Sequence, residues 1–183
     1  MKQKLFLITA YKETIRNQGY GRVIKAASNA GYTVEVLDLQ IQNSGLVDAV
    51  TEGIKTINQD RTGSKAILGF STGALIAYKI SAKIEFEKAF FCSLSPILNG
   101  DIPATTAPYV RYFGKEIVTE LKKQNYGTSL AKRSFFFTGD KEGRKLVGRT
   151  KLLVRENSGE LILVKNNNHE LNVGYTNEIA LKL

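Results

Sequence analysis

Short runs of apolar residues, rich in β-branched and aromatic side chains, alternate along the chain with longer segments in which apolar residues recur at helical spacing. Short apolar runs bounded by polar or glycine-containing stretches are typical of buried strands. The pattern predicts strands at residues 4–9, 33–39, 66–70, 88–94, 134–138 and 161–165. It predicts helices at residues 20–29, 44–59, 72–84, 145–156 and 176–183.

This alternation predicts an α/β fold. Parallel strands that are buried on both faces have continuous apolar sequences, and right-handed helical crossovers join them. We therefore expect one domain over residues 1–183, a three-layer α/β/α sandwich with a mostly parallel six-stranded sheet. Residues 96–133 break the alternation and hold a helical stretch at 110–124. An insertion of that length at the strand ends predicts a small cap.

The composition is that of an ordinary globular protein. The 183 residues are 43% hydrophobic and 23% charged, and no run approaches the ~18 apolar residues that cross a membrane. The apolar run near Met1 is too short for the core of a signal peptide, so the expected location is the cytoplasm. The single cysteine, Cys92, excludes an internal disulfide, and its apolar neighbours favour a packing role.

Positive charge is concentrated in one part of the sequence. The net charge is +9, and residues 111–155 hold twelve Lys and Arg residues but only four acidic residues. Such a segment can attract anionic substrates, nucleic acid or acidic membrane surfaces. Since no aromatic residues interleave with the basic ones and no nucleic-acid motif is present, a solvated helical surface is the favoured interpretation.

The sequence Gly69-Phe70-Ser71-Thr72-Gly73 has the form G-x-S-x-G, at the end of a predicted strand and the start of a predicted helix. A serine on so tight a turn needs small residues two positions before and after it, and glycine meets this need. The turn lifts the serine hydroxyl above the sheet, and the free amides of the following helix point to the same place. We therefore predict Ser71 as a nucleophile and the Thr72 amide as a donor to an oxyanion.

A nucleophilic serine needs a base, and His169 is the only histidine in the chain. It lies in a polar loop directly after the sixth predicted strand, beyond a strand end like Ser71, which favours a catalytic role. Two carboxylates, Asp140 and Glu142, follow the fifth predicted strand. Either can orient His169, and the other is expected to cap the helix that follows.

The order of these residues along the chain, Ser71, then an acid, then His169, resembles that of the α/β-hydrolase family, as does the turn at Ser71. The resemblance covers essentially the whole chain. It implies a compact α/β-hydrolase fold without two leading antiparallel strands, with the strands in the order 2-1-3-4-5-6. The family's acid usually lies three residues after the glycine of a G-x-x-D loop. This position corresponds to Glu142 and favours it over Asp140.

One departure from the family concerns the loop after the first strand. Family members commonly carry His-Gly there, where this chain has Thr9-Ala10. By position, the Tyr11 amide is the implied second oxyanion donor. The resemblance implies hydrolysis of a carboxylic ester or thioester through an acyl-enzyme, without an external cofactor or a metal. The implied partner is a small-molecule substrate, for which the basic segment would suit an anionic moiety.

Two other functions are open at this stage. A catalytically silent α/β-hydrolase scaffold that serves as a binding or regulatory module is the main alternative, because fold alone does not imply activity. Lysophospholipid or membrane-surface work is a third interpretation of the basic segment. Neither nucleic-acid binding nor stable membrane insertion is expected. The sequence leaves the acyl chain, the leaving group and the oligomeric state open.

Overall fold

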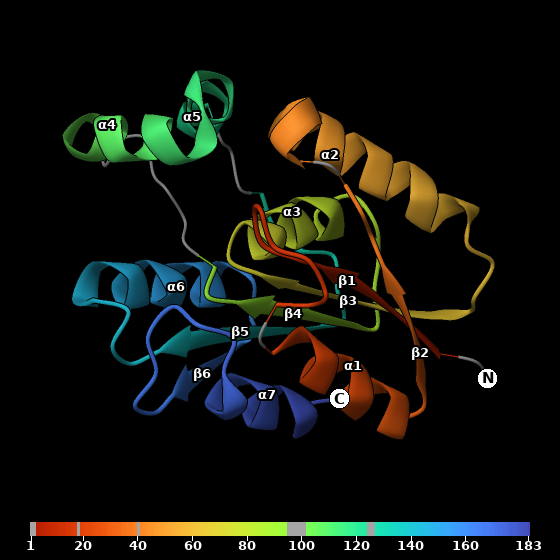
Figure 1. Cartoon of the computed structure of the whole chain (residues 1–183). Helices are drawn as coiled ribbons and strands as arrows, with labels where there is room; N and C mark the ends of the chain where they lie inside the picture. Colours follow the sequence, from red (N-terminus) through yellow and green to blue (C-terminus); the bar gives the residue numbers. More distant parts are fainter. Residues whose placement is uncertain (1–2, 18, 40, 95–101, 124–126) are drawn as a thin grey trace.

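The computed structural model describes residues 3–17, 19–39, 41–94, 102–123 and 127–183. In this part of the chain, six parallel strands form one sheet in the order β2-β1-β3-β4-β5-β6 (Figure 1). The strands are β1 (Gln3–Ile8), β2 (Tyr32–Val36), β3 (Ser64–Phe70), β4 (Lys88–Cys92), β5 (Arg133–Gly139) and β6 (Glu160–Val164). The predicted α/β class, the parallel sheet and the strand order are confirmed.

Helices cover both faces of the sheet. They are α1 (Tyr20–Asn29), α2 (Ile41–Gln59), α3 (Thr72–Ser81), α4 (Ile102–Phe113), α5 (Lys115–Lys122), α6 (Arg144–Glu156) and α7 (Val173–Ala180). Helices α1 and α7 lie on one face, and α2, α3 and α6 lie on the other (Figure 1). This is the predicted three-layer arrangement. None of the helices in the described ranges is both long and apolar enough to cross a membrane.

The central strands are buried on both faces, which explains their continuous apolar sequences. Phe90 of β4 and Phe135 of β5 stack with ring centroids 5.3 Å apart, in the cluster that includes residues of α1 and α7. The next residues along the two strands are Phe91 and Phe136, whose ring centroids lie 5.0 Å apart in the cluster that includes residues of α2 and α3. Cys92 is fully buried in the first cluster, and burial raises the pKa of its thiol, in agreement with the predicted packing role.

The parallel register brings the carboxyl ends of the strands to one edge of the sheet. Phe70 at the end of β3 pairs with Cys92 at the end of β4, and Gly139 of β5 pairs with Val164 of β6. The loops that follow these strands therefore open at the same edge. In open α/β sheets this edge is where ligands bind.

Glycine interrupts two of the predicted helices, whereas the helices predicted at 72–84 and 176–183 differ only at their ends, at 72–81 and 173–180. The helix predicted at residues 110–124 is instead the end of α4 and the whole of α5, because Gly114 adopts a φ of 86° between them. The helix predicted to begin at Ser44 begins earlier, at Ile41, and is interrupted at Gly45 with a φ of 83°. Glycine adopts this left-handed region without the steric cost that other residues incur.

The amide that follows this interruption is capped from another helix. The Leu46 amide donates to Oε2 of Glu120 on α5 at 2.6 Å, in the position where a side chain of α2 would otherwise cap the helix. The sequence around α2 gives no sign of this cap, because its acceptor lies seventy-four positions further along the chain. The contact links α5 to the start of the main part of α2.

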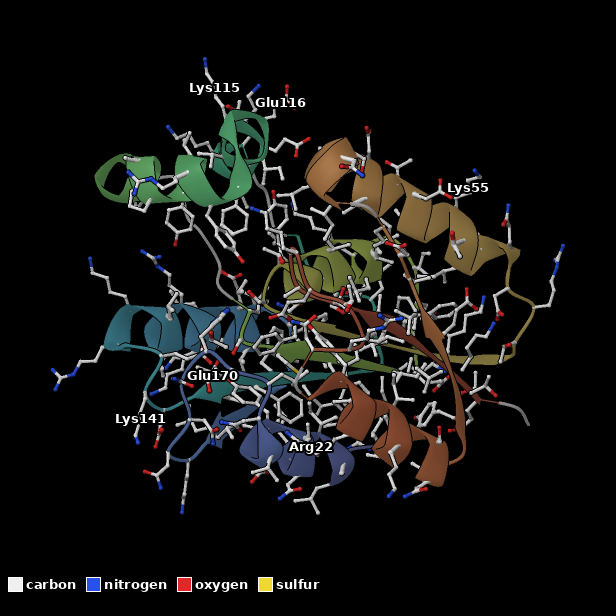
Figure 2. All side chains as sticks on the ribbon, viewed as in Figure 1. Arg22, Lys55, Lys115, Glu116, Lys141 and Glu170 are labelled. Carbon is white, nitrogen blue, oxygen red and sulfur yellow. The ribbon has the colours of Figure 1, made fainter. Side chains whose placement is uncertain are left out.

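Helices α4 and α5 connect β4 to β5 and lie on the α3 side of the sheet, with α5 next to α2 (Figure 1). They fall within the insertion predicted at residues 96–133, of which 96–101 and 124–126 lie outside the described residues. The buried face of α5 joins the cluster of α2 and α3 through Ile117, Val118 and Leu121. Its polar face points outward, as Lys115 does in Figure 2.

We expect Glu120→Ala to lower the free energy of unfolding by about 1 kcal/mol, since the substitution removes a cap from α2. For a chain of this length, that loss corresponds to a fall of about 2–4 °C in the melting temperature. Thermal unfolding followed by circular dichroism measures it. Glu52→Ala, which removes an exposed carboxylate from a surface ion pair with Lys55 on α2, is the control and should change the melting temperature less. Equal shifts in the two variants would contradict the capping role.

Candidate active site

Ser71 occupies a sharp turn between β3 and α3. Its φ of 54° lies in the left-handed region, and its amide donates to the Cys92 carbonyl at 2.8 Å. The flanking glycines are required by space: a Cβ on Gly69 would lie 2.2 Å from the Gly73 carbonyl oxygen, and one on Gly73 would lie 2.4 Å from that of Ile8. The G-x-S-x-G sequence therefore forms the strained strand-to-helix turn that it predicts.

His169 lies between Ser71 and Glu142. Its Nε2 is 2.8 Å from Ser71 Oγ, and its Nδ1 is 2.9 Å from Glu142 Oε2. When Nδ1 carries the proton and donates to Glu142, Nε2 is free to accept the proton of the Ser71 hydroxyl. The Phe70 ring, whose centroid is 5.4 Å from that of the imidazole, packs beside it. The fold thus joins residues from three separate loops in one chain of hydrogen bonds.

The Glu142 side chain is only 2% exposed and is held by donors from three elements. Its Oε1 accepts hydrogen bonds from Ser93 Oγ at 2.6 Å, from the Gly139 amide at 2.8 Å and from the Tyr175 hydroxyl. Burial alone would raise the pKa of Glu142, but hydrogen bonds from His169, Ser93, Tyr175 and Gly139 outweigh it and hold the pKa below its usual value. Glu142 is therefore a buried carboxylate that stays ionised near neutral pH.

Asp140, the alternative acid, has a different position. Its side chain accepts a hydrogen bond from the Asn167 amide at 3.2 Å, and the residue is exposed. The prediction that the second carboxylate caps the following helix is wrong, because α6 begins after Gly143 and has no side-chain cap. Asp140 instead ties the loop after β5 to the loop that carries His169.

Thr72 and Tyr11, the predicted oxyanion donors, contact each other. The Tyr11 amide donates to Thr72 Oγ1 at 2.6 Å. The Thr72 amide lies at the first position of α3, where backbone amides have no partner within the helix. The hydrogen of the Tyr11 amide is therefore already engaged by the side chain of Thr72, next to Ser71. The Thr72 hydroxyl keeps its own proton to donate.

A cavity of about 280 Å³ opens at Ser71. Side chains of α3, α4, α5 and α6 line it together with the loop of His169: Ser71, Thr72, Leu75, Tyr109, Phe113, Leu121, Leu146 and His169. Most of these side chains are apolar, with the polar groups gathered at Ser71. In the described part of the chain, no three His, Cys, Asp or Glu side chains lie close enough together to hold a metal ion.

Two residues of the site were not predicted. Ser93 directly follows β4, at the same sheet edge as Ser71, so its position in the sequence offered a signal. Tyr175 lies in the first turn of α7, and its hydroxyl contacts Ser93 Oγ at 2.7 Å as well as Glu142. Nothing in the local sequence distinguishes this tyrosine from a core residue.

Glu142→Gln keeps the acceptor Oε1 but removes the charge. A glutamate whose pKa is lowered on folding stabilises the protein above its unfolded pKa, near 4.5, and the contribution is lost as the pH falls through the lower folded pKa. We therefore expect wild type to exceed Glu142→Gln in unfolding free energy near neutral pH, with a difference that shrinks below about pH 4.5. Urea unfolding across this range measures the difference. A difference that did not depend on pH would contradict the lowered pKa.

No protein-family profile matches the sequence, and a search of curated proteins finds no match. Solved structures do match. Est1E from Butyrivibrio proteoclasticus with ferulic acid bound has a TM-score of 0.74 at 10% identity, over 98% of this chain and 85% of that chain. Mouse alpha/beta hydrolase domain-containing protein 10 has a TM-score of 0.73 at 10% identity, over 98% and 87%. An esterase from Pyrococcus furiosus has a TM-score of 0.67 at 16% identity, over 98% and 81%. The chain therefore has the fold of the α/β hydrolases.

Proposed function

We propose that the protein is a serine hydrolase that cleaves a carboxylic ester or thioester through an acyl-enzyme intermediate. The observation that carries this proposal is the unbroken chain of hydrogen bonds from Ser71 through His169 to Glu142, which begins at an apolar cavity. The likeness to solved hydrolases supports the same reaction class, since an esterase is among them. Ser71 is assigned as nucleophile, His169 as general base and acid, and Glu142 as the residue that orients His169.

The reaction proceeds in two halves. Ser71 Oγ attacks the carbonyl carbon while its proton passes to His169 Nε2, and the carbonyl electron pair moves onto oxygen. The carbonyl then re-forms, the bond to the leaving oxygen or sulfur breaks, and the leaving group takes the proton from His169. In the second half, His169 removes a proton from water, which attacks the acyl-enzyme. Release of the carboxylic acid returns the proton to Ser71.

The negative oxygen of the tetrahedral intermediate needs donors that are already in place. We assign the Thr72 amide as one donor. The Tyr11 amide, whose hydrogen points to Thr72 Oγ1, acts through that hydroxyl: it polarises Thr72 Oγ1, which donates its own proton to the oxyanion. This assignment uses both residues predicted for the oxyanion site but places the Thr72 side chain between Tyr11 and the substrate.

The cavity indicates an apolar acyl group, because Leu75, Phe113 and Leu146 form its wall beyond Ser71. Helices α4 and α5 contribute Tyr109, Phe113 and Leu121 to this wall, so the insertion serves as a cap that defines the acyl site. Ferulic acid, the compound bound in the structure of Est1E, is a small aromatic carboxylic acid. A small-molecule ester is the substrate class that these features support.

A fluorophosphonate probe together with a panel of p-nitrophenyl esters tests the proposal. We expect the probe to label wild type, and Ser71→Ala to lose the label and to lower kcat by about 10⁶-fold. Ser28→Ala, which alters an exposed serine of α1, is the matched control and should retain both. Labelling that survives Ser71→Ala would overturn the assignment of the nucleophile. A wild type with neither labelling nor esterase activity would favour the silent scaffold.

Thr72→Val removes the hydroxyl and keeps the shape of the side chain. We expect it to lower kcat by about 10²–10³-fold with a small change in KM, because it removes a donor that acts on the oxyanion. Thr72→Ser, which keeps a hydroxyl at the same position, should retain most of the activity. Steady-state kinetics on a p-nitrophenyl ester measures both variants. An unchanged or higher kcat in Thr72→Val would mean that the hydroxyl merely blocks the Tyr11 amide.

A further inference from the structure

A tight turn at residues 10–13, the 10–13 turn, follows β1 and carries the Tyr11 amide. The Glu13 amide donates to the Ala10 carbonyl at 3.0 Å and closes the segment as a β-turn. The amide of the second residue takes no part in that bond, and here it donates to Thr72 Oγ1 instead. The direction of the Tyr11 amide therefore depends on how the turn is held.

The 10–13 turn has a conformation that its sequence does not favour. Lys12, its third residue, has a φ of 62°. Glycine or asparagine usually occupies this left-handed region in a turn, because a larger side chain makes it costly. Such a conformation persists only where the surrounding structure fixes it. Contacts from outside the turn must therefore offset the cost at Lys12.

The hydroxyl of Tyr20, the first residue of α1, supplies two such contacts. It accepts a hydrogen bond from the Ala10 amide at 2.8 Å and donates its proton to Glu13 Oε2 at 2.6 Å. One side-chain oxygen thus joins the first and last residues of the 10–13 turn. The Tyr20 side chain is fully buried, and burial raises the pKa of its hydroxyl, as does the bond to Glu13. The hydroxyl therefore keeps its proton at neutral pH and directs it to Glu13.

Tyr20 is also fixed relative to the loop that carries His169. It directly follows Gly19, whose φ is 101°. A Cβ on Gly19 would overlap the Leu171 carbonyl oxygen, so the start of α1 lies against this loop. The Tyr20 ring packs in the same apolar cluster as Leu171. The Tyr20 hydroxyl therefore sets the position of the 10–13 turn relative to the loop of His169.

We propose that Tyr20 is a positioning residue for the oxyanion site, which it fixes through the hydrogen bonds of its hydroxyl to Ala10 and Glu13. The inference rests on the proposed ester hydrolysis and adds to it a residue of α1, on the face of the sheet opposite α3 (Figure 1). The described residues that line the cavity at Ser71 do not include Tyr20. Its effect therefore passes through the 10–13 turn to the Tyr11 amide, and from there to the Thr72 hydroxyl.

The expected effect belongs to the transition state. The carbonyl oxygen of the ester gains negative charge only as Ser71 attacks, so a donor held in place lowers the barrier without binding the ester itself more tightly. Loss of the Tyr20 hydroxyl takes one partner from the Ala10 amide and one from the Glu13 carboxylate, and the turn is then free to move. A displacement of about 1 Å at the site can lower the rate by about 10²-fold.

Tyr20→Phe keeps the buried ring and removes only the hydroxyl. With a p-nitrophenyl ester, we expect it to lower kcat by about 10–100-fold and to change KM by less than about threefold. Tyr78→Phe is the matched control, since it also removes a buried hydroxyl, one whose partners include Gly127 and Asn157. Both variants should lower the melting temperature, but Tyr78→Phe should leave kcat unchanged. An unchanged kcat in folded Tyr20→Phe would overturn the inference.

Glu13→Ala tests the same hydrogen bonds without a change in the core, because Glu13 is only half-buried. It removes the acceptor that orients the Tyr20 hydroxyl, and we expect kcat to fall while KM changes little. If Tyr20→Phe fails to fold, this variant decides: an unchanged kcat in Glu13→Ala would then overturn the inference.

Combination with Thr72→Val separates positioning from a general loosening of the fold. If Tyr20 acts through the Tyr11 amide and the Thr72 hydroxyl, Tyr20→Phe should lower kcat with Thr72 present but hardly further in Thr72→Val, where the group that it acts through is gone. A loosened fold would lower kcat by the same factor in both backgrounds. Equal factors would therefore overturn the positioning role.

Wild type separates this inference from the proposed hydrolysis. A wild type that neither hydrolyses the ester nor is labelled by the fluorophosphonate would overturn the hydrolase function, and the inference with it. If hydrolysis and labelling are present in wild type and lost in Ser71→Ala, the hydrolase function stands. An unchanged kcat in Tyr20→Phe would then overturn the positioning role alone.

Discussion

A carboxylate whose side chain is 2% exposed can stay charged only where donors replace the water that it has lost, and Glu142 is held in this way. Its donors come from the ends of two strands, through Ser93 and Gly139, and from α7, through Tyr175. His169 binds the remaining oxygen from the loop after β6. If any one of these elements moved away, the buried Glu142 carboxylate would lose a hydrogen bond. The need to keep all of these bonds therefore fixes the relative positions of the loops.

The same constraint explains why Asp140 and Glu142 have different positions and contacts. Asp140 precedes Glu142 by two residues, but it lies at the surface and accepts one backbone hydrogen bond, from Asn167. That bond holds the start of the loop that carries His169. One acid thus positions the backbone of the loop, and the other contacts the imidazole that this loop presents. Both act on His169 in the folded protein, although only Glu142 touches it.

A feature of the site could be predicted from the sequence where the residues that determine it lie close together along the chain. The turn at Ser71 depends on glycines two residues away, so its motif could be recognised, and strand order followed from the family resemblance. The residues alone left Asp140 and Glu142 open, and the family resemblance favoured Glu142, which lies beside His169 in the structure. Tyr175 and the Glu120 cap on α2 involve residues more than thirty positions apart, and no local pattern records such contacts. The helix break at Gly114 was missed because an isolated glycine inside an apolar helical pattern can be tolerated within a helix or can end it.

Helix α3 connects the separate parts of the site. Its first amides lie beside Ser71, where the positive end of the helix dipole favours a negative charge. Thr72 and Leu75 of this helix line the cavity at Ser71, and Leu75 also lines a second cavity between α2 and α3. At the other end, the dipole favours the charge of Lys79, yet the pKa of Lys79 is lowered, because burial and Lys83 outweigh it. The charge at this end is therefore costly in the free protein. The two ends of α3 therefore differ: negative charge is favoured beside Ser71, whereas the positive charge at Lys79 is disfavoured by its surroundings.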